Sequence, residues 1–86
     1  VIICIDIDSM DPSITPNTIG RVPGGLTYFQ VLNLIKGVAQ KAKIEAMDFA
    51  EIMPEVDIDG IGGLTVSRLI ASSMGVIARQ KQRADS

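Results

Sequence analysis

Apolar and polar positions follow different patterns along the chain, and each pattern predicts an element. Residues 1 to 8 begin with a nearly unbroken apolar run, which is typical of a strand buried on both faces of a parallel sheet. Residues 9 to 25 contain three prolines and three glycines, so they predict a loop. A loop of that length within a compact domain is usually functional.

The rest of the chain repeats this order. Residues 27 to 42 have helical apolar spacing, with Thr27 as the expected N-cap and Gln30 as its capping-box partner. Residues 44 to 52 predict a second strand, which Pro54 closes. Residues 60 to 82 predict a second helix, with an apolar stripe of Leu64, Leu69, Ile70, Met74 and Ile77. Strand, helix, strand and helix form a right-handed βαβ unit and one more helix.

The first strand needs neighbours on both sides, yet it opens the chain without an initiator Met. A chain of 86 residues is one small domain at most, and such domains are marginally stable alone. We therefore expect residues 1–86 to be the C-terminal portion of a single larger α/β domain.

Composition narrows the possible partners. Eight Lys or Arg against ten Asp or Glu, with 3% aromatic residues, argue against nucleic acid. No apolar run approaches the roughly 18 residues that cross a bilayer, so we expect a cytoplasmic protein without a membrane partner. One cysteine and no histidine exclude an internal disulfide and the usual zinc sites. Cys4 is expected to be a small core residue, and any metal must be held by carboxylates.

Acidic residues occur where both predicted strands end, and open parallel sheets bind ligands at those ends. Asp6 and Asp8 alternate with the two-residue period of a strand, which would place both carboxylates on one face. Two adjacent carboxylates need a cation such as Mn²⁺ or Mg²⁺, unless backbone amides satisfy them. Glu51, at the second strand end, is either paired structurally or directed at a cationic substrate.

Three further acids have simpler interpretations. Asp11 precedes Pro12 and either starts a turn or adds an outer contact to a metal. Asp57 and Asp59 lie before Gly60, with the wrong spacing for a calcium loop, so turn formation and helix capping are expected there.

The two acidic segments together resemble the ureohydrolase family, which comprises the arginases and agmatinases. The first runs from Cys4-Ile5-Asp6-Ile7-Asp8 through Pro12 and Pro16 to Gly24-Gly25-Leu26-Thr27. The second runs from Met47 through Glu51 and Pro54 to Asp57 and Gly60. The resemblance implies a three-layer α/β/α sandwich with a parallel sheet, to which this chain contributes a β-α-β-α portion.

In such a fold two Mn²⁺ ions activate a hydroxide that attacks a guanidinium carbon and releases urea and an amine. The resemblance implies that Asp6 bridges both ions, that Asp8 binds one, and that Glu51 binds the guanidinium. The implied substrate is agmatine, as in polyamine biosynthesis, or else arginine, and the implied assembly is a homo-oligomer, a trimer or hexamer. The family's His ligands come from earlier strands, so the isolated chain is expected to be inactive.

Departures from the family pattern leave alternatives open. The segment from Asn17 to Arg21 replaces a Thr-rich, Pro-containing turn, so a hydroxyl near the substrate is missing at Gly20. Gly62-Gly63 replaces a Thr-Ala pair. A catalytically degenerate or purely structural piece is one alternative. Another is a haloacid-dehalogenase-type phosphatase, in which Asp6 would be the nucleophile and Asp8 the acid and base.

Overall fold

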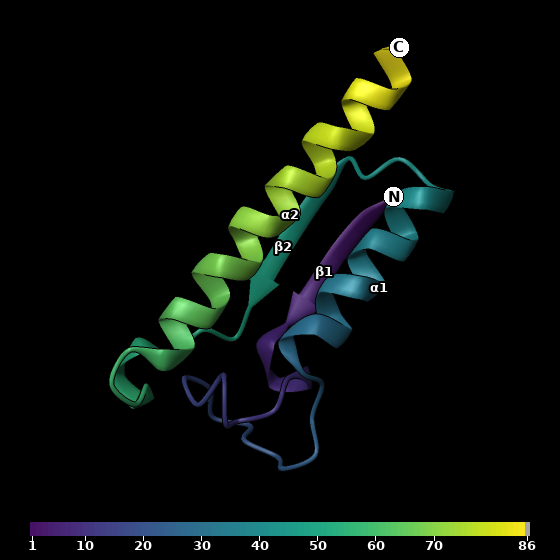
Figure 1. Cartoon of the computed structure of the whole chain (residues 1–86). Coiled ribbons are helices and arrows are strands. Elements are labelled where there is room, and N and C mark those ends of the chain that lie inside the picture. The colour runs from purple at the N-terminus through teal and green to yellow at the C-terminus, as the bar shows by residue number, and fades with distance from the viewer. Residues whose placement is uncertain (86) are drawn as a thin grey trace.

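The four predicted elements form in the predicted order. The computed structural model describes the chain from Val1 to Asp85, and its side chains as far as Arg83. The elements are β1 (Ile2–Asp6), the 3-10 turn η1 (Ile7–Ser9), α1 (Tyr28–Lys41), β2 (Ala46–Ala50), the 3-10 turn η2 (Pro54–Val56) and α2 (Ile61–Asp85). Figure 1 shows the two strands side by side, with both helices running along them. Both strands are shorter than expected from the sequence: β1 ends where η1 begins, and β2 ends at Ala50, with three residues between it and η2.

The two strands are parallel, and their register runs from Ile2 opposite Ala46 to Asp6 opposite Ala50. Alternate side chains face the helices: Ile3, Ile5, Met47 and Phe49 pack against the core that α1 and α2 build. The opposite face is exposed, and Ile2 keeps 67% of its surface accessible. The described residues therefore supply the sheet and one helical layer of a sandwich.

Two expectations for β1 are wrong within the described part of the chain. The strand is half-buried on one face and exposed on the other, because no described element covers that second face. Cys4 is exposed on that uncovered face and is no core residue here. A period of two puts Cys4 on the opposite side of the strand from Ile3 and Ile5.

Helix α1 begins as the sequence predicts. The Thr27 side chain accepts a hydrogen bond from Gln30 N, and the Gln30 side chain accepts one from Thr27 N, which completes the capping box. The helix buries Val31, Leu32 and Ile35 against the sheet and α2. The capping box and the apolar spacing both predict this helix, and its observed limits lie within one residue of the predicted ones.

Helix α2 turns a different face to the core than the sequence suggested. Leu69 is fully buried, and Val66 and Ser73 are buried beside it, whereas Leu64 and Met74 are exposed. Leu64 and Met74 each lie five residues from Leu69, about 140° around a helix of 3.6 residues per turn. The predicted stripe therefore combined residues from separate faces, and Ser73 is accommodated because its hydroxyl donates to Leu69 O at 2.7 Å.

One described helix is long and apolar enough to cross a membrane by length and composition alone. It covers 61–83, within α2, and contains an 18-residue window with a mean hydropathy of 1.5. The core helix of a soluble protein meets the same criterion, and α2 packs one face on α1. The absence of a membrane partner stays a prediction.

The long loop between β1 and α1 is closed at its base. Asp11 N donates to Leu26 O at 2.9 Å, and Leu26 N donates to Ser9 O at 2.9 Å. A Cβ on Gly25 would lie 2.6 to 2.7 Å from the backbone of Met10 and Asp11, so only glycine fits this close approach. The loop thus leaves and re-enters the fold at one point beside the end of β1.

Candidate metal and substrate site

The end of β1 is a tight acidic turn. Asp6 is the last strand residue and the N-cap of η1, where its Oδ1 accepts a hydrogen bond from Asp8 N at 2.9 Å. Ser9 Oγ donates to Asp6 O at 2.7 Å. The bond from Asp8 N orients the Asp6 carboxylate, and the bond from Ser9 holds the Asp6 backbone.

Asp8 lies on this turn rather than on the strand. The expectation that the pleat aligns both carboxylates is wrong in its reason, because β1 ends at Asp6 and Ile7 opens the turn. The turn places the backbone N of Asp8 within hydrogen-bond distance of Asp6 Oδ1. Asp11 N is bonded to Leu26 O instead, so the chain has left this turn by then.

The Asp8 carboxylate is covered by the loop and incompletely satisfied. Its Oδ1 is buried and has no hydrogen-bond partner among the described residues. A Cβ on Gly20 would lie 2.8 Å from Asp8 Oδ2, so Gly20 packs directly on the carboxylate. A buried acceptor without a donor is unfavourable and indicates a missing partner, such as an ordered water or a cation.

Glu51 directly follows β2, the strand that pairs with β1. Ala50 pairs with Asp6 across strands about 4.8 Å apart, so Glu51 is one residue beyond that pair. Its backbone φ is 67°, in the left-handed region that residues other than glycine rarely adopt. Its side chain is exposed. Such a conformation persists only when the surroundings impose it, and it often marks functional positions.

Asp11 and Asp57 serve the backbone instead. Asp11 accepts bonds from Ser13 N and Gly24 N, each at 3.0 Å, so turn formation is the role the structure gives it. Hydrogen bonds from Ser13 and Gly24 lower its pKa. Asp57 accepts from Gly63 N and Gly62 N at 2.9 Å, which caps the first turn of α2 as expected. Hydrogen bonds from Gly63, and then from Gly62, lower the pKa of Asp57.

Polar residues of the loop form a feature that the sequence did not reveal. Thr15, Asn17 and Thr18 are buried, although they lie between predicted breakers. Asn17 O accepts a hydrogen bond from Met53 N at 2.7 Å, which joins the loop to the segment after Glu51. The segment from Asn17 to Arg21 departs from the family pattern, which could have drawn attention to it. No residue near it in the sequence indicated that it docks on the segment after Glu51.

A metal would find part of a site here. Asp6 and Asp8 offer hard carboxylate oxygens, the donors that Mn²⁺ accepts, and the unpartnered Asp8 Oδ1 fits such an ion. The described residues contain no group of three or more His, Cys, Asp or Glu that could hold a metal. Asp6 and Asp8 are thus two candidate donors, and the described residues alone do not form a complete metal site.

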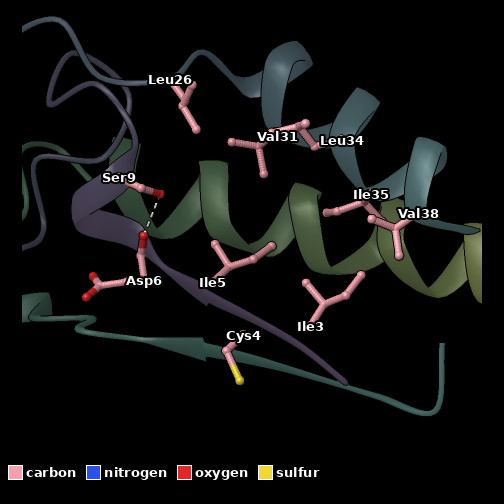
Figure 2. A pocket seen from close by; sticks show the side chains of 10 residues that line it. All are labelled: Ile3, Cys4, Ile5, Asp6, Ser9, Leu26, Val31, Leu34, Ile35 and Val38. Atoms are coloured by element: carbon pink, nitrogen blue, oxygen red, sulfur yellow. Dashed lines mark hydrogen bonds between the residues drawn. The ribbon is translucent and has the colours of Figure 1, made fainter. Parts of the chain in front are cut away.

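A separate apolar cavity runs beside the other edge of β1. Figure 2 shows Ile3 and Ile5 on one side and α1 on the other, with Asp6 and Ser9 at one end and Cys4 pointing away from the helices. Its volume is about 360 Å³. β1 has a strand partner on one side only in the described two-stranded sheet. An unpaired edge above an apolar groove is typical of a place where further structure packs.

Comparison with known proteins identifies the fold. The model of the arginase family matches residues 1–75. The chain is 33% identical over 76 residues to the N(1)-aminopropylagmatine ureohydrolase of Thermus thermophilus, covering 88% of this chain and 25% of that protein. It is 37% identical over 84 residues to an agmatinase of Chromobacterium violaceum, covering 98% of this chain and 26% of that one.

A solved structure gives the same result. Proclavaminate amidino hydrolase from Streptomyces clavuligerus superposes with a TM-score of 0.84 at 32% identity, over 93% of this chain and 26% of that one. The chain thus spans about a quarter of the length of the relatives it matches. Its β-α-β-α portion with parallel strands is the corresponding part of their fold, and the chain belongs to the arginase family of ureohydrolases.

Proposed function

We propose that the protein carrying this chain hydrolyses a guanidino compound to urea and an amine, with agmatine as the favoured substrate and arginine next. The observation that carries this proposal is the buried, unpartnered Asp8 Oδ1 beside Asp6 at the end of a parallel strand. Membership of the arginase family supports the reaction class. It also removes the reason to interpret Asp6 and Asp8 as a phosphatase pair.

Asp6 and Asp8 would be the Mn²⁺ ligands that this chain contributes. Bound Mn²⁺ would supply Lewis-acid polarisation and a lowered pKa of coordinated water. The chain's own contribution is orientation: Asp8 N and the η1 turn fix the Asp6 carboxylate, and the loop around Gly20 keeps solvent from Asp8 Oδ1. The remaining ligands would come from the part of the fold outside these residues.

Glu51 would bind the substrate guanidinium. A carboxylate and a guanidinium form paired, charge-assisted hydrogen bonds with defined geometry. The left-handed backbone at Glu51 turns the chain at the sheet mouth, one residue past the position opposite Asp6. This placement would hold the guanidinium next to the metal ligands, where orientation lowers the barrier.

Agmatine is favoured on the segment from Pro54 to Asp57 with Gly60, which resembles agmatinases more than arginases. The names of the relatives do not separate the two substrates, since they include an agmatinase and an arginase that are both 37% identical to this chain. The complete protein would contain an N-terminal part that covers the exposed face of β1 and fills the groove in Figure 2. We further propose a cytoplasmic homo-oligomer, trimeric or hexameric, without nucleic-acid or membrane partners. The isolated chain would be inactive, since it supplies two metal donors.

One alternative keeps a specific observation in its favour. Gly20 packs on Asp8 where the family has a hydroxyl, and this change fits a catalytically degenerate member. Retention of Asp6, Asp8 and Glu51 fits an active enzyme better, because a structural piece needs none of these three acids.

The test is urea release by the full-length protein with added Mn²⁺, using agmatine, arginine and shorter guanidino acids. We expect turnover of agmatine that Asp8→Ala abolishes and Glu45→Ala preserves, since Glu45 is an exposed acid at the opposite end of the strands. Turnover of arginine in preference to agmatine would correct the substrate. No urea from any compound, together with no Mn²⁺ binding, would establish the degenerate alternative.

A further inference from the structure

The segment that carries Glu51 is held from two sides. Behind it, β2 pairs with β1 as far as Ala50 opposite Asp6. Ahead of it, Met53 N donates a 2.7 Å hydrogen bond to Asn17 O of the long loop. Glu51 lies between these attachments with its φ at 67°. Because a left-handed glutamate needs its surroundings to hold it, the contact at Asn17 determines part of its placement.

The Asn17 side chain is held by close steric contact with Gly62. Its side chain is 1% exposed, and its Oδ1 has no hydrogen-bond partner among the described residues. A Cβ on Gly62 would lie 2.0 Å from Asn17 Oδ1 and 2.3 Å from Asn17 Cγ. Gly62 is in the first turn of α2 with ordinary helical backbone, so its conformation does not require glycine. The Asn17 side chain occupies the space that any larger residue at 62 would need.

A second tie joins the same two segments. Arg21 Nε donates to Pro16 O at 2.6 Å within the loop, and Arg21 Nη2 donates to Val56 O in η2. The guanidinium thereby bridges the loop and the connection between β2 and α2. Gly62 N also donates to Asp57 Oδ1 at 2.9 Å, which anchors the helix end against which Asn17 packs. The loop and this connection are thus one docked unit.

We propose that Asn17 is a positioning residue for Glu51, with Gly62 as its obligatory partner. The seating of the Asn17 side chain against Gly62 sets where Asn17 O meets Met53 N, and so where the Glu51 carboxylate lies. The inference rests on the proposed function in one respect, that Glu51 binds the guanidinium. A substrate whose carboxylate contact is displaced binds and orients less well, and KM responds more than metal binding does.

The test is a double-mutant cycle in the full-length protein with Gly62→Ala, Asn17→Gly and the pair. Gly62→Ala should lower kcat/KM for the guanidino substrate by about 100-fold, mostly through KM, as expected for a misplaced contact of about 1 Å. In the Asn17→Gly background the same substitution should add little, because the clashing side chain is gone. Gly75→Ala is the matched control, since a Cβ there meets nothing within 4 Å.

The thermal midpoint and Mn²⁺ affinity are measured on the same four proteins. The inference is supported if the effects of the two substitutions on the thermal midpoint and on KM are non-additive while the Mn²⁺ affinity is unchanged. An unchanged KM in Gly62→Ala, or strictly additive effects, would overturn it. If Gly62→Ala yields too little folded protein, Asn17→Gly alone decides, through a raised KM with kcat and Mn²⁺ affinity retained. If the thermal midpoints of the four proteins are non-additive but the wild type releases no urea, the proposed function is refuted. The docking of Asn17 on Gly62 still stands in that case.

Discussion

Replacing Asp8 by Ala should change the stability of the protein in opposite directions with and without manganese. In the metal-free protein, Asp8 Oδ1 is a buried acceptor that lacks a partner among the described residues. Such a group costs about 1–3 kcal/mol of desolvation. Asp8→Ala removes that cost and leaves a small space beside Gly20. We therefore expect the free energy of unfolding of the metal-free protein to rise by up to about 2 kcal/mol.

With manganese the order should reverse. A ligand that binds only the folded state adds about 2.7 kcal/mol when its free concentration is roughly 100 times Kd. The wild type should gain this amount, and Asp8→Ala should lose most of it. The two stability curves then cross as manganese is titrated. A residue with only a structural role would give curves that stay apart by a constant amount.

The assay is chemical denaturation of the full-length protein after treatment with a chelator, repeated over a manganese series. Glu45→Ala serves as the control, because it removes an exposed acid at the far end of the sheet. Its curve should follow that of the wild type throughout. Two results refute the reasoning: a metal-free Asp8→Ala protein less stable than the wild type, or a wild type that manganese does not stabilise.

Three further predictions follow from single residues. Leu69→Ala should lower the free energy of unfolding by about 2–5 kcal/mol in urea titrations, since Leu69 of α2 is fully buried against α1 and the sheet. A loss under about 1 kcal/mol would disprove that packing. Glu51→Gly should stabilise the fold by about 1 kcal/mol by relieving the left-handed backbone while abolishing urea release, and an active variant would exclude Glu51 from substrate binding. The pKa of Asp57 is lowered from 3.8 by hydrogen bonds from Gly63 and Gly62, so its stabilising effect exists above that pH and is lost as pH falls through the folded pKa. The thermal midpoints of wild type and Asp57→Asn should therefore converge in acid, and a constant difference would contradict this capping role.

Much of the fold could be predicted because its signals are local. Thr27 and Gln30 specify the start of α1 through bonds between residues three apart, and the structure contains both. Apolar runs with Pro and Gly between them define two strands and the loop, and the family resemblance is confirmed by the match over residues 1–75. Asp57 was expected to cap a helix, and it does, because capping also spans only a few residues.

The arrangement of the site residues was predicted less accurately than the order of helices and strands. Asp6 and Asp8 were predicted to lie on one face of a strand, but β1 ends at Asp6 and Asp8 lies in the 3-10 turn, with its backbone N bonded to Asp6 Oδ1. A strand end is decided by where its partner stops pairing, and β2 stops at Ala50. The roles of Asp6, Asp8 and Glu51 as ligands remain predictions that the titration and the urea assay address.

The sequence by itself determined the order of elements, the start of α1, the acidic strand ends and the family. Each of these depends on the residue types themselves or on contacts within about one turn of chain. Only the tertiary structure decided which face of α2 is buried, because Leu64, Leu69 and Met74 are equally apolar and the choice belongs to the surface they meet. It also decided that Asn17 seats against Gly62, 45 positions along the chain. Steric fit between distant segments has no periodic trace in a single sequence.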